Sequence, residues 1–356
     1  MTYRGAMTST IDATTPSASL PPELISFIEG MPKCELHVHL EGTLAPDLKL
    51  ALAQRNGIDI GQSTVEEVVA SYQFDSLTSF LGVYYPAMNV LQHEEDFFDL
   101  TWAYLAKAAS QQVRYAEMFF DPQAHTSRGV PFPTIVRGVR RAMITAEAQL
   151  GIRSGLIMCF LRDLTVDFAM ATLMDALPYK ADIIGVGLDS DERGNPPSKF
   201  ADVFARARAE GFLLTMHCDI DQQSSIEHIR QVIEDIGVDR IDHGTNIVEN
   251  PALVAVARAK GLGLTCCPVS NSFVTNDMKA TEIVSLLRDG VKVTVNSDDP
   301  AYFQGYMTEN FLALAAHAGL GKDELVQLSA NAFQVAWLTH HARQGFLAEL
   351  ADYAAG

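Results

Sequence analysis

The sequence has 356 residues, of which 48% are hydrophobic and 20% are charged, so it holds enough apolar surface for one large core. Its 44 acidic and 26 basic side chains leave a formal net charge of −18, which disfavours nucleic acids and anionic membrane surfaces as partners. No apolar run approaches the ~20 residues that span a bilayer, and the amino terminus lacks the apolar segment of a secretory signal.

Residues 1–20 are rich in Ser, Thr, Ala and Pro, and we expect a flexible leader there, followed by a single domain over residues 21–356. An amphipathic helix is predicted over 21–31, and the next segment is strand-like and ends at His39. Residues 47–112 show successive helical patterns and no strand pattern. We therefore expect several helices there that cover one face of the domain. Five irregularly spaced cysteines without a CxxC pair indicate reduced thiols in a cytoplasmic protein.

Short apolar runs then alternate with helical stretches. Seven runs follow the one that ends at His39, namely 113–120, 155–161, 183–188, 212–217, 240–243, 261–267 and 291–297. Helices are predicted between them at 166–177, 198–210, 225–236 and 252–260, and the chain after Tyr306 reads as helical, with one amphipathic run over 308–338. Alternation of this kind indicates a parallel sheet covered on both faces. Eight units favour an α/β fold of the (β/α)8 TIM barrel type, with extra helices after strand 1 and at the carboxyl terminus, although an open doubly wound sheet shows the same alternation.

Side chains of the metal-ligand type stand at the carboxyl ends of four of these runs: His37 and His39, His217, His243, and the Asp298-Asp299 pair. In a parallel barrel these ends share one mouth, where active sites lie. His37 and His39 are two residues apart on a strand, so both point to one side. Barrel closure brings the eighth strand next to the first, so Asp298 can approach this pair. Three imidazoles and one carboxylate suit Zn²⁺ and leave a position for water.

Each of these features also has an ordinary structural interpretation. A strand-end HxH pair can make simple hydrogen bonds, an Asp-Asp-Pro step can be a turn, and a lone histidine can lie in the core. The coincidence at four strand ends favours a metal site. Phe80, Leu81 and Tyr84 have helical spacing that fits either core packing or a pocket lid. The remaining histidines are expected to be structural or solvated: His93, His125, His228, His317, His340 and His341.

Several stretches resemble the adenosine/adenine deaminase family of the amidohydrolase superfamily. They are MPKCELHVHLEGTL (31–44), GVGLDSDERGNPPSKF (185–200), RIDHGTNIVENP (240–251), TCCPVSN (265–271) and VTVNSDDPAYFQGY (293–306). They run in family order and extend over about residues 31–340. The resemblance implies a single Zn²⁺ held by His37, His39, His217 and Asp298, and a purine as the small-molecule substrate.

By the family pattern, His243 orients and helps to deprotonate the attacking water, and Asp299 holds the nucleophile and the N7 edge of the purine. Addition at C6 requires an acid beside N1, because that nitrogen gains a proton as the ring loses aromaticity. The family acid is a Glu in a His-Ala-Gly-Glu stretch. This chain has His-Cys-Asp-Ile-Asp over 217–221, so either Asp219 or Asp221 is expected to serve, and strand parity with His217 favours Asp219.

Two positions bear on the substrate. Adenosine deaminases carry Asp in place of Glu41, where it meets the ribose, and the longer Glu41 would crowd that spot. By the same resemblance, Glu41 and the following Gly42 are expected to contact the substrate. Ser190 stands where nucleoside enzymes tend to have Gly. Both features look like the adenine deaminase branch, which acts on the free base and includes relatives that act on N6-substituted adenines.

The sequence therefore predicts hydrolytic deamination of adenine to hypoxanthine and ammonia in purine salvage, with N6-substituted adenines, which would release an amine, as further candidate substrates. Adenosine deaminase, another metal hydrolase, and a purine-binding relative that has lost its acid remain as alternatives. The oligomeric state stays open, with a homo-oligomer among the alternatives.

Overall fold

The computed structural model describes residues 20–218 and 225–356. Eight parallel strands form one sheet in the order of the chain, from β1 to β8. The strands are β1 (Lys33–His39), β2 (Val113–Phe120), β3 (Arg153–Leu161), β4 (Gly185–Asp189), β5 (Leu213–Cys218), β6 (Arg240–His243), β7 (Gly263–Cys266) and β8 (Lys292–Val295). The predicted (β/α)8 barrel is confirmed.

The barrel closes between β8 and β1. The backbone N–H of His39 donates to the carbonyl of Asp298 at 2.9 Å, and the N–H of Asp298 donates to the carbonyl of His37 at 3.0 Å. Regular strand geometry ends before this point, because β8 stops at Val295 and Asp298 has a left-handed φ of 65°. The predicted strand over 291–297 was therefore too long at its carboxyl end, and Asp298 joins β1 through an isolated bridge.

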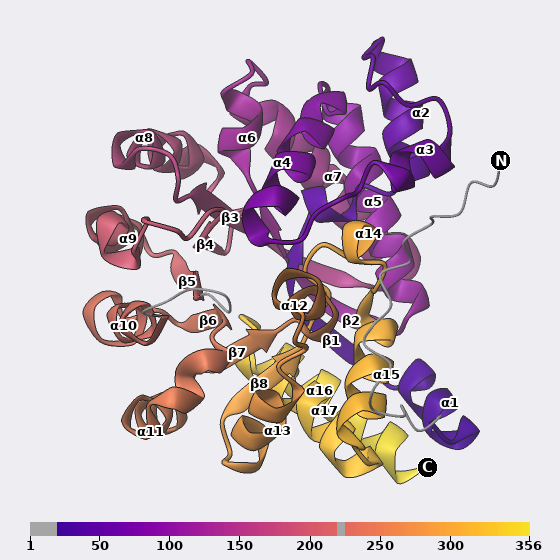
Figure 1. The fold of residues 1–356 in the computed structure, drawn as a ribbon, viewed down its shortest axis with the longest axis vertical. Helices are drawn as coiled ribbons and strands as arrows, with labels where there is room; N and C mark the ends of the chain where they lie inside the picture. Colours follow the sequence, from indigo (N-terminus) through magenta and orange to yellow (C-terminus); the bar gives the residue numbers. More distant parts are fainter. Residues whose placement is uncertain (1–19, 219–224) are drawn as a thin grey trace, which may run out of the picture.

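Helices surround the sheet (Figure 1). They are α1 (Pro22–Gly30), α2 (Pro46–Asn56), α3 (Val65–Ala70), α4 (Leu77–Ala87), α5 (Glu94–Ser110), α6 (Pro122–Thr126), α7 (Phe132–Leu150), α8 (Val166–Ala176), α9 (Ala201–Glu210), α10 (Ser225–Arg230), α11 (Pro251–Lys260), α12 (Pro268–Thr275), α13 (Ala280–Arg288), α14 (Pro300–Phe303), α15 (Met307–Ala318), α16 (Lys322–Val335) and α17 (His340–Ala355). The extra helices expected after β1 are α2 to α5, and those at the carboxyl terminus are α15 to α17.

Two predicted helices differ in detail. The run expected over 308–338 is divided, because Gly319 ends α15 in a left-handed conformation (φ 65°) and α16 begins three residues later. The helix expected over 225–236 is regular only as far as Arg230 and continues as a wider turn over 231–236. Both differences come from local backbone geometry that hydrophobic periodicity does not encode.

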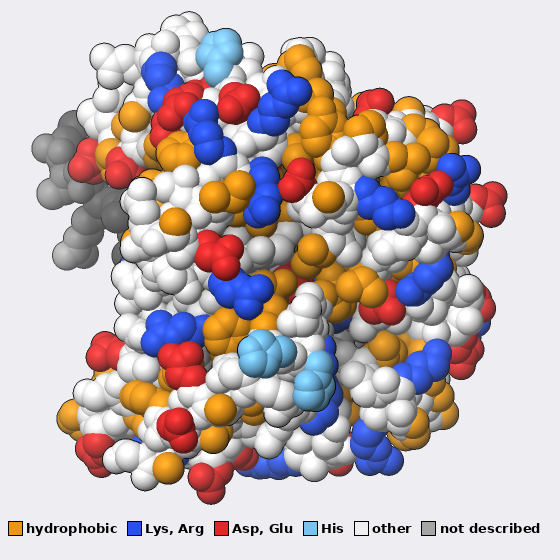
Figure 2. All heavy atoms as spheres, turned by 180° about the vertical axis from the view of Figure 1, so that it is seen from behind, with side chains coloured by type: hydrophobic (Ala, Val, Ile, Leu, Met, Phe, Trp, Pro, Cys, Tyr) orange, Lys and Arg blue, Asp and Glu red, His pale blue; other side chains and the backbone are white. Residues whose placement is uncertain are grey.

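A buried ion pair lies inside the barrel, away from the strand ends that carry the histidines. The Arg240 guanidinium on β6 donates to Glu117 on β2, and it stacks on the Trp337 ring with 4.4 Å to the ring centroid. The backbone N–H of Trp337 donates to the other Glu117 oxygen at 2.6 Å. Gly185 on β4 leaves the space for this ring, because a Cβ there would lie 2.4 Å from Trp337. The face opposite to the view of Figure 1 carries intermixed acidic, basic and apolar groups (Figure 2).

Candidate active site

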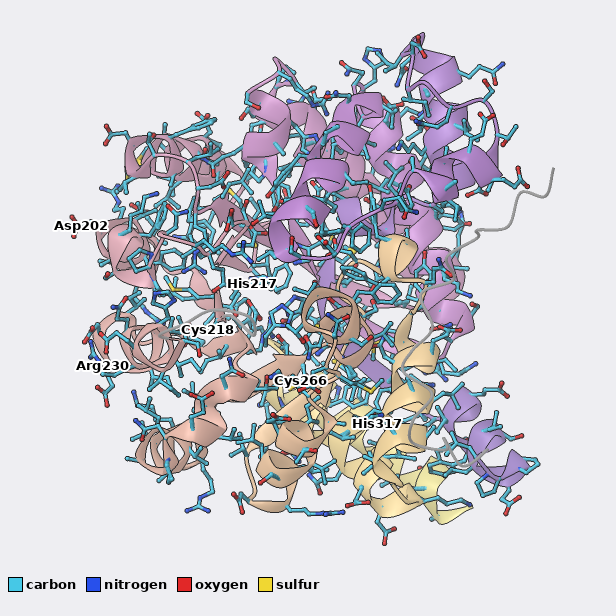
Figure 3. All side chains as sticks on the ribbon, in the orientation of Figure 1. Asp202, His217, Cys218, Arg230, Cys266 and His317 are labelled. Carbon is cyan, nitrogen blue, oxygen red and sulfur yellow. The ribbon has the colours of Figure 1, made fainter. Side chains whose placement is uncertain are left out.

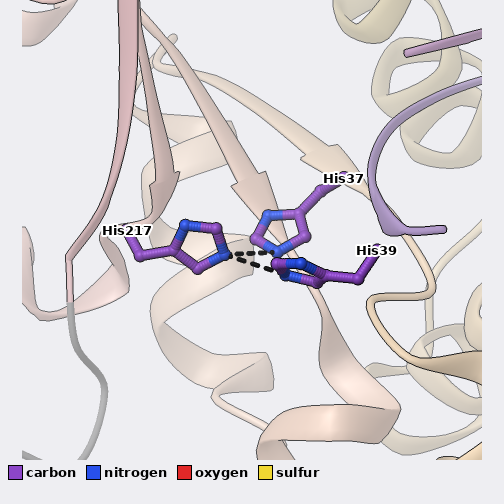
Figure 4. A group of neighbouring side chains, drawn as sticks. All are labelled: His37, His39 and His217. Carbon is purple, nitrogen blue, oxygen red and sulfur yellow. Dashed lines mark hydrogen bonds between the residues drawn. The ribbon is translucent and has the colours of Figure 1, made fainter. Parts of the chain in front are cut away.

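Three histidines from two strands converge at the carboxyl end of the barrel (Figure 4). The Nε2 atom of His217 lies 3.1 Å from Nε2 of His37 and 3.1 Å from Nε2 of His39. His37 is fully buried, and His39 and His217 are each 7% exposed. The two-residue spacing on β1 places both of its imidazoles on the inner face, as the sequence predicted.

In two of these imidazoles, the hydrogen bond made by Nδ1 fixes which ring nitrogen carries the proton. His217 Nδ1 lies 3.0 Å from the Leu188 carbonyl, which only accepts, so Nδ1 carries the hydrogen. His37 Nδ1 lies 2.8 Å from the Thr265 hydroxyl, which in turn donates to Asp242 at 2.9 Å. Both rings therefore turn the lone pair of Nε2 toward the same point. Without a cation this convergence is repulsive, so the donor set fits a metal ion.

Asp298 completes the set. Its Oδ1 lies 3.2 Å from His37 Nε2 and 3.4 Å from His39 Nε2. A tetrahedral ion with bonds of about 2.1 Å separates its ligand atoms by about 3.4 Å, close to the distances found here. The second oxygen, Oδ2, accepts from the Ser270 hydroxyl at 2.6 Å, which orients the carboxylate. A divalent metal ion with nitrogen and oxygen ligands fits these four residues.

His243 and Asp299 lie beside this set. His243 has a left-handed φ of 57°, its Nε2 lies 3.8 Å from Asp298 Oδ2, and its Nδ1 has no partner among the described residues. Burial, together with the nearby His37, lowers the pKa of His243 to about 4. Burial and the charge of Asp298 raise the pKa of Asp299. No nitrogen or oxygen donor of the described residues reaches Asp299 Oδ1, so both side chains present free polar atoms.

The site opens into a cavity of ≈ 630 Å³, counting the part open to solvent. Its wall includes Ser190, which has a left-handed φ of 74°, and the α4 side chains Phe80, Leu81 and Tyr84. Phe80 and Tyr84 are each 3% exposed and also belong to the hydrophobic core. The core-packing interpretation is confirmed for these side chains, which also line the cavity, whereas a role of α4 as a lid stays a prediction. Apolar side chains beside a few convergent polar groups form the kind of lining that suits a small molecule.

Glu41 and Gly42 lie behind the cavity wall rather than on it. The Glu41 side chain is 1% exposed, and its Oε1 accepts from the Asp121 backbone N–H at 3.1 Å and pairs with His125 Nε2 at 2.8 Å. A Cβ on Gly42 would lie 2.0 Å from Asp299 Oδ1, so this glycine gives room to the Asp299 carboxylate. The substrate contacts predicted for these two residues stay predictions.

Sequence reasoning missed two carboxylates of the cavity. Asp121 directly follows β2 and Asp189 ends β4, and both line the cavity. They are 1% and 2% exposed. Burial raises the pKa of Asp121, and burial raises the pKa of Asp189 to about 7. Their position at strand ends was the available signal, since the same criterion identified His217 and His243.

Asp219 and Asp221, the predicted proton donors, lie outside the described residues. Figure 3 shows His217 and Cys218, the last two residues of β5, near the middle of the barrel.

The six histidines that were expected to be structural or solvated differ in burial. His125 is buried and His228 is half-buried. The other four are exposed, namely His93, His317, His340 and His341.

Comparison with known proteins shows the family. A model of the adenosine deaminase family matches residues 32–353. The chain belongs to this family. An uncharacterized deaminase of Schizosaccharomyces pombe is 51% identical over 92% of this chain and 97% of its own length. An adenine deaminase of Acinetobacter baylyi is 49% identical over 91% of this chain and 98% of its own. The predicted family is confirmed, and with it the expectation of a hydrolytic deaminase.

Solved structures agree with this assignment. The adenine deaminase of Arthrobacter aurescens superposes with a TM-score of 0.88 at 40% identity, over 92% of this chain and all of that one. An amidohydrolase of Burkholderia ambifaria with bound Zn has a TM-score of 0.85 at 26% identity, over 96% and 97% of the two chains. Within the described ranges, no helix is both long and apolar enough to cross a membrane.

Proposed function

We propose that this chain deaminates adenine by hydrolysis. Water adds to C6 of the purine, the bond from C6 to the exocyclic nitrogen breaks, and hypoxanthine and ammonia leave. The observation that carries the proposal is the convergence of three imidazole Nε2 atoms and one Asp298 oxygen on a single point in the cavity wall. Named relatives at 49% and 40% identity, both adenine deaminases, support the purine base as substrate.

We propose Zn²⁺ as the metal, one per chain, held by His37, His39, His217 and Asp298. When bound there, the ion acts as a Lewis acid and makes water a nucleophile near neutral pH. The Zn-bound amidohydrolase relative supports this choice. Three neutral imidazoles and one carboxylate also match the mixed nitrogen and oxygen preference of Zn²⁺.

The remaining steps belong to side chains around the cavity. His243 Nε2 takes a proton from the attacking water, and burial keeps this imidazole neutral and able to accept it. Asp299 holds the water and the N7 edge of the purine. Phe80, Leu81 and Tyr84 cover the base and exclude bulk water. Asp219 or Asp221 gives a proton to N1.

The protein loaded with Zn²⁺ is incubated with adenine, adenosine and N6-methyladenine, and ammonia or methylamine is measured with the purine product. We expect adenine to give the highest kcat/KM. Turnover of adenosine far above that of adenine would contradict the free-base assignment. Release of methylamine from N6-methyladenine would show that the site accepts an N6 substituent.

The proton donor is tested with Asp219→Asn and Asp221→Asn, each measured for zinc content and for adenine turnover. We expect one variant to lose turnover while it retains zinc, which identifies the acid. If the wild-type protein binds hypoxanthine but no purine is turned over, the chain is a binding protein and not an enzyme.

We place the enzyme in the cytoplasm, in purine salvage. All five cysteines are buried and none forms a disulfide within the described residues, which suits a reducing compartment. Both a monomer and a homo-oligomer are compatible with this proposal, because all the proposed site residues come from one chain. Sedimentation of the zinc-loaded protein measures the state directly.

A further inference from the structure

Two buried carboxylates of the cavity have no role in the chemistry described so far. Asp121 and Asp189 are 1% and 2% exposed, and both line the cavity. Apart from their contact with each other and the contact of Asp189 with the Cys159 thiol, Asp121 Oδ1 and both oxygens of Asp189 receive no hydrogen bond from the described residues. Buried carboxylates with so few donors are costly, so these atoms point to a ligand that carries hydrogen-bond donors.

Their place in the site indicates which part of a ligand they meet. Asp189 Oδ2 lies 3.5 Å from Nδ1 of His39. Nε2 of the same ring faces the other proposed metal ligands. Asp121 lies in the same group, because one ligand-type atom each of His39, Asp121 and Asp189 lies within 4.8 Å of the others. Both carboxylates therefore lie about one imidazole ring away from the point where the reacting carbon is held. A purine that presents C6 to the proposed metal ion and N7 to Asp299 directs its N3–N9 edge away from the metal ligands and from Asp299.

The chemistry of that edge separates a free base from its derivatives. Adenine carries a hydrogen on N9 and can donate it, whereas a nucleoside or a 9-alkyl purine has carbon there and donates nothing. A carboxyl oxygen of this pair can accept the N9–H, which a nucleoside does not offer, so the pair matches the free base. No Lys or Arg of the described residues lines the cavity, so nothing there offsets the repulsion between these carboxylates and a phosphate group.

We propose that Asp121 and Asp189 form the subsite that accepts the N9–H of a free purine base, and that this subsite selects the base over the nucleoside. The inference rests on the proposed function and adds its specificity determinant. A substrate without N9–H leaves buried carboxylates unpaired in the bound state. Sites built to bond a donor reject analogues that lack it far more strongly than apolar pockets reject a misfit.

The test compares adenine with 9-methyladenine in the zinc-loaded wild type and in Asp121→Asn and Asp189→Asn. We expect the wild type to prefer adenine strongly in kcat/KM. We expect at least one variant to lose about 10- to 100-fold for adenine, the value of one hydrogen bond to a charged acceptor, and to change little for 9-methyladenine. Inhibition by hypoxanthine and by 9-methylhypoxanthine reports the same preference without turnover.

Asp163→Asn is the matched control. Asp163 follows β3, between the strands that carry the two carboxylates, but its side chain is exposed and does not line the cavity. We expect it to keep wild-type kinetics for both purines. Thermal unfolding and zinc content of all three variants show that each is folded and loaded.

The outcomes separate the two proposals. If the wild type turns over no adenine, the proposed function fails. If it deaminates adenine but treats 9-methyladenine equally well, the inference about Asp121 and Asp189 is overturned while the proposed function stands. A similar loss for both purines in both variants also overturns it, because a general structural role moves the two substrates together.

Discussion

Gly42 is the position where one added methyl group has the clearest predicted effect. In Gly42→Ala the new Cβ would lie 2.0 Å from Asp299 Oδ1, 2.7 Å from its Cγ and 2.8 Å from its Cα. Two of these contacts are to the side chain and one is to the backbone, so rotation of the carboxylate alone does not relieve them. The backbone and the side chain of Asp299 must therefore move together.

The size of this movement follows from the contact distances. Ordinary carbon–oxygen contacts begin at about 3.4 Å, so the Asp299 carboxylate must shift by about 1.4 Å. A misplacement of about 1 Å at a reacting group can lower the rate about 100-fold. We therefore expect Gly42→Ala to lower kcat/KM for adenine by at least about 100-fold. The effect arises from geometry, since the side chains of the site are all retained.

The assay is steady-state deamination of adenine by the zinc-loaded variant, with zinc content and thermal unfolding measured on the same sample. Gly82→Ala is the control, because Gly82 lies in α4 with no atom within 4 Å of the added Cβ. It should retain kcat/KM and gain up to about 1 kcal/mol of stability. If Gly42→Ala binds zinc and keeps more than a tenth of the wild-type kcat/KM, the contact with Asp299 does not control catalysis.

Three further predictions concern metal binding and stability. Thr265→Val removes the hydroxyl that links His37 to Asp242, and we expect metal affinity, measured by competition with a chromophoric chelator, to fall about 10- to 100-fold. The control is Thr215→Val, which removes a 2.7 Å hydrogen bond to Asp242 but no hydrogen bond to a histidine. An equal loss of metal affinity in this variant would refute a specific role of the contact between Thr265 and His37. Glu117→Gln leaves Arg240 buried beside a neutral partner, and the free energy of unfolding in urea should fall by about 3 kcal/mol; a change below about 1 kcal/mol would contradict this. Removal of the metal with a chelator should lower Tm in a way that added Zn²⁺ reverses, because the ion binds the folded arrangement of Nε2 atoms; an unchanged Tm would argue against a structural contribution.

Much of the site could be predicted from the order of residues along the chain. The ends of β1, β5 and β6 were identified by short apolar runs, and His37, His39, His217 and His243 stand at or next to these ends. The prediction succeeds because a parallel barrel brings the carboxyl ends of all its strands to one mouth. Once the fold class is known, residues at these ends are therefore expected to lie close together.

Partners that come from distant strands could not be predicted in the same way. His37 and Thr265 are 228 residues apart, and Glu41 and His125 are 84 apart, yet each pair meets at 2.8 Å. His125 was expected only as a structural or solvated residue, and the structure shows that it holds the Glu41 carboxylate. A hydrogen bond between side chains leaves no periodic trace in either segment, so only the folded arrangement reveals it.

The sequence by itself determined the eight-unit alternation, the inner-face parity of His37 and His39, and the set of residue types that can hold a metal. The tertiary structure decided the role of Gly42 as space for Asp299 and the scarcity of hydrogen-bond donors around Asp121 and Asp189. The physical reason is the range of the interactions. Strand and helix patterns arise from neighbours along the chain, whereas close approach and the lack of a hydrogen-bond donor depend on every element that packs around an atom.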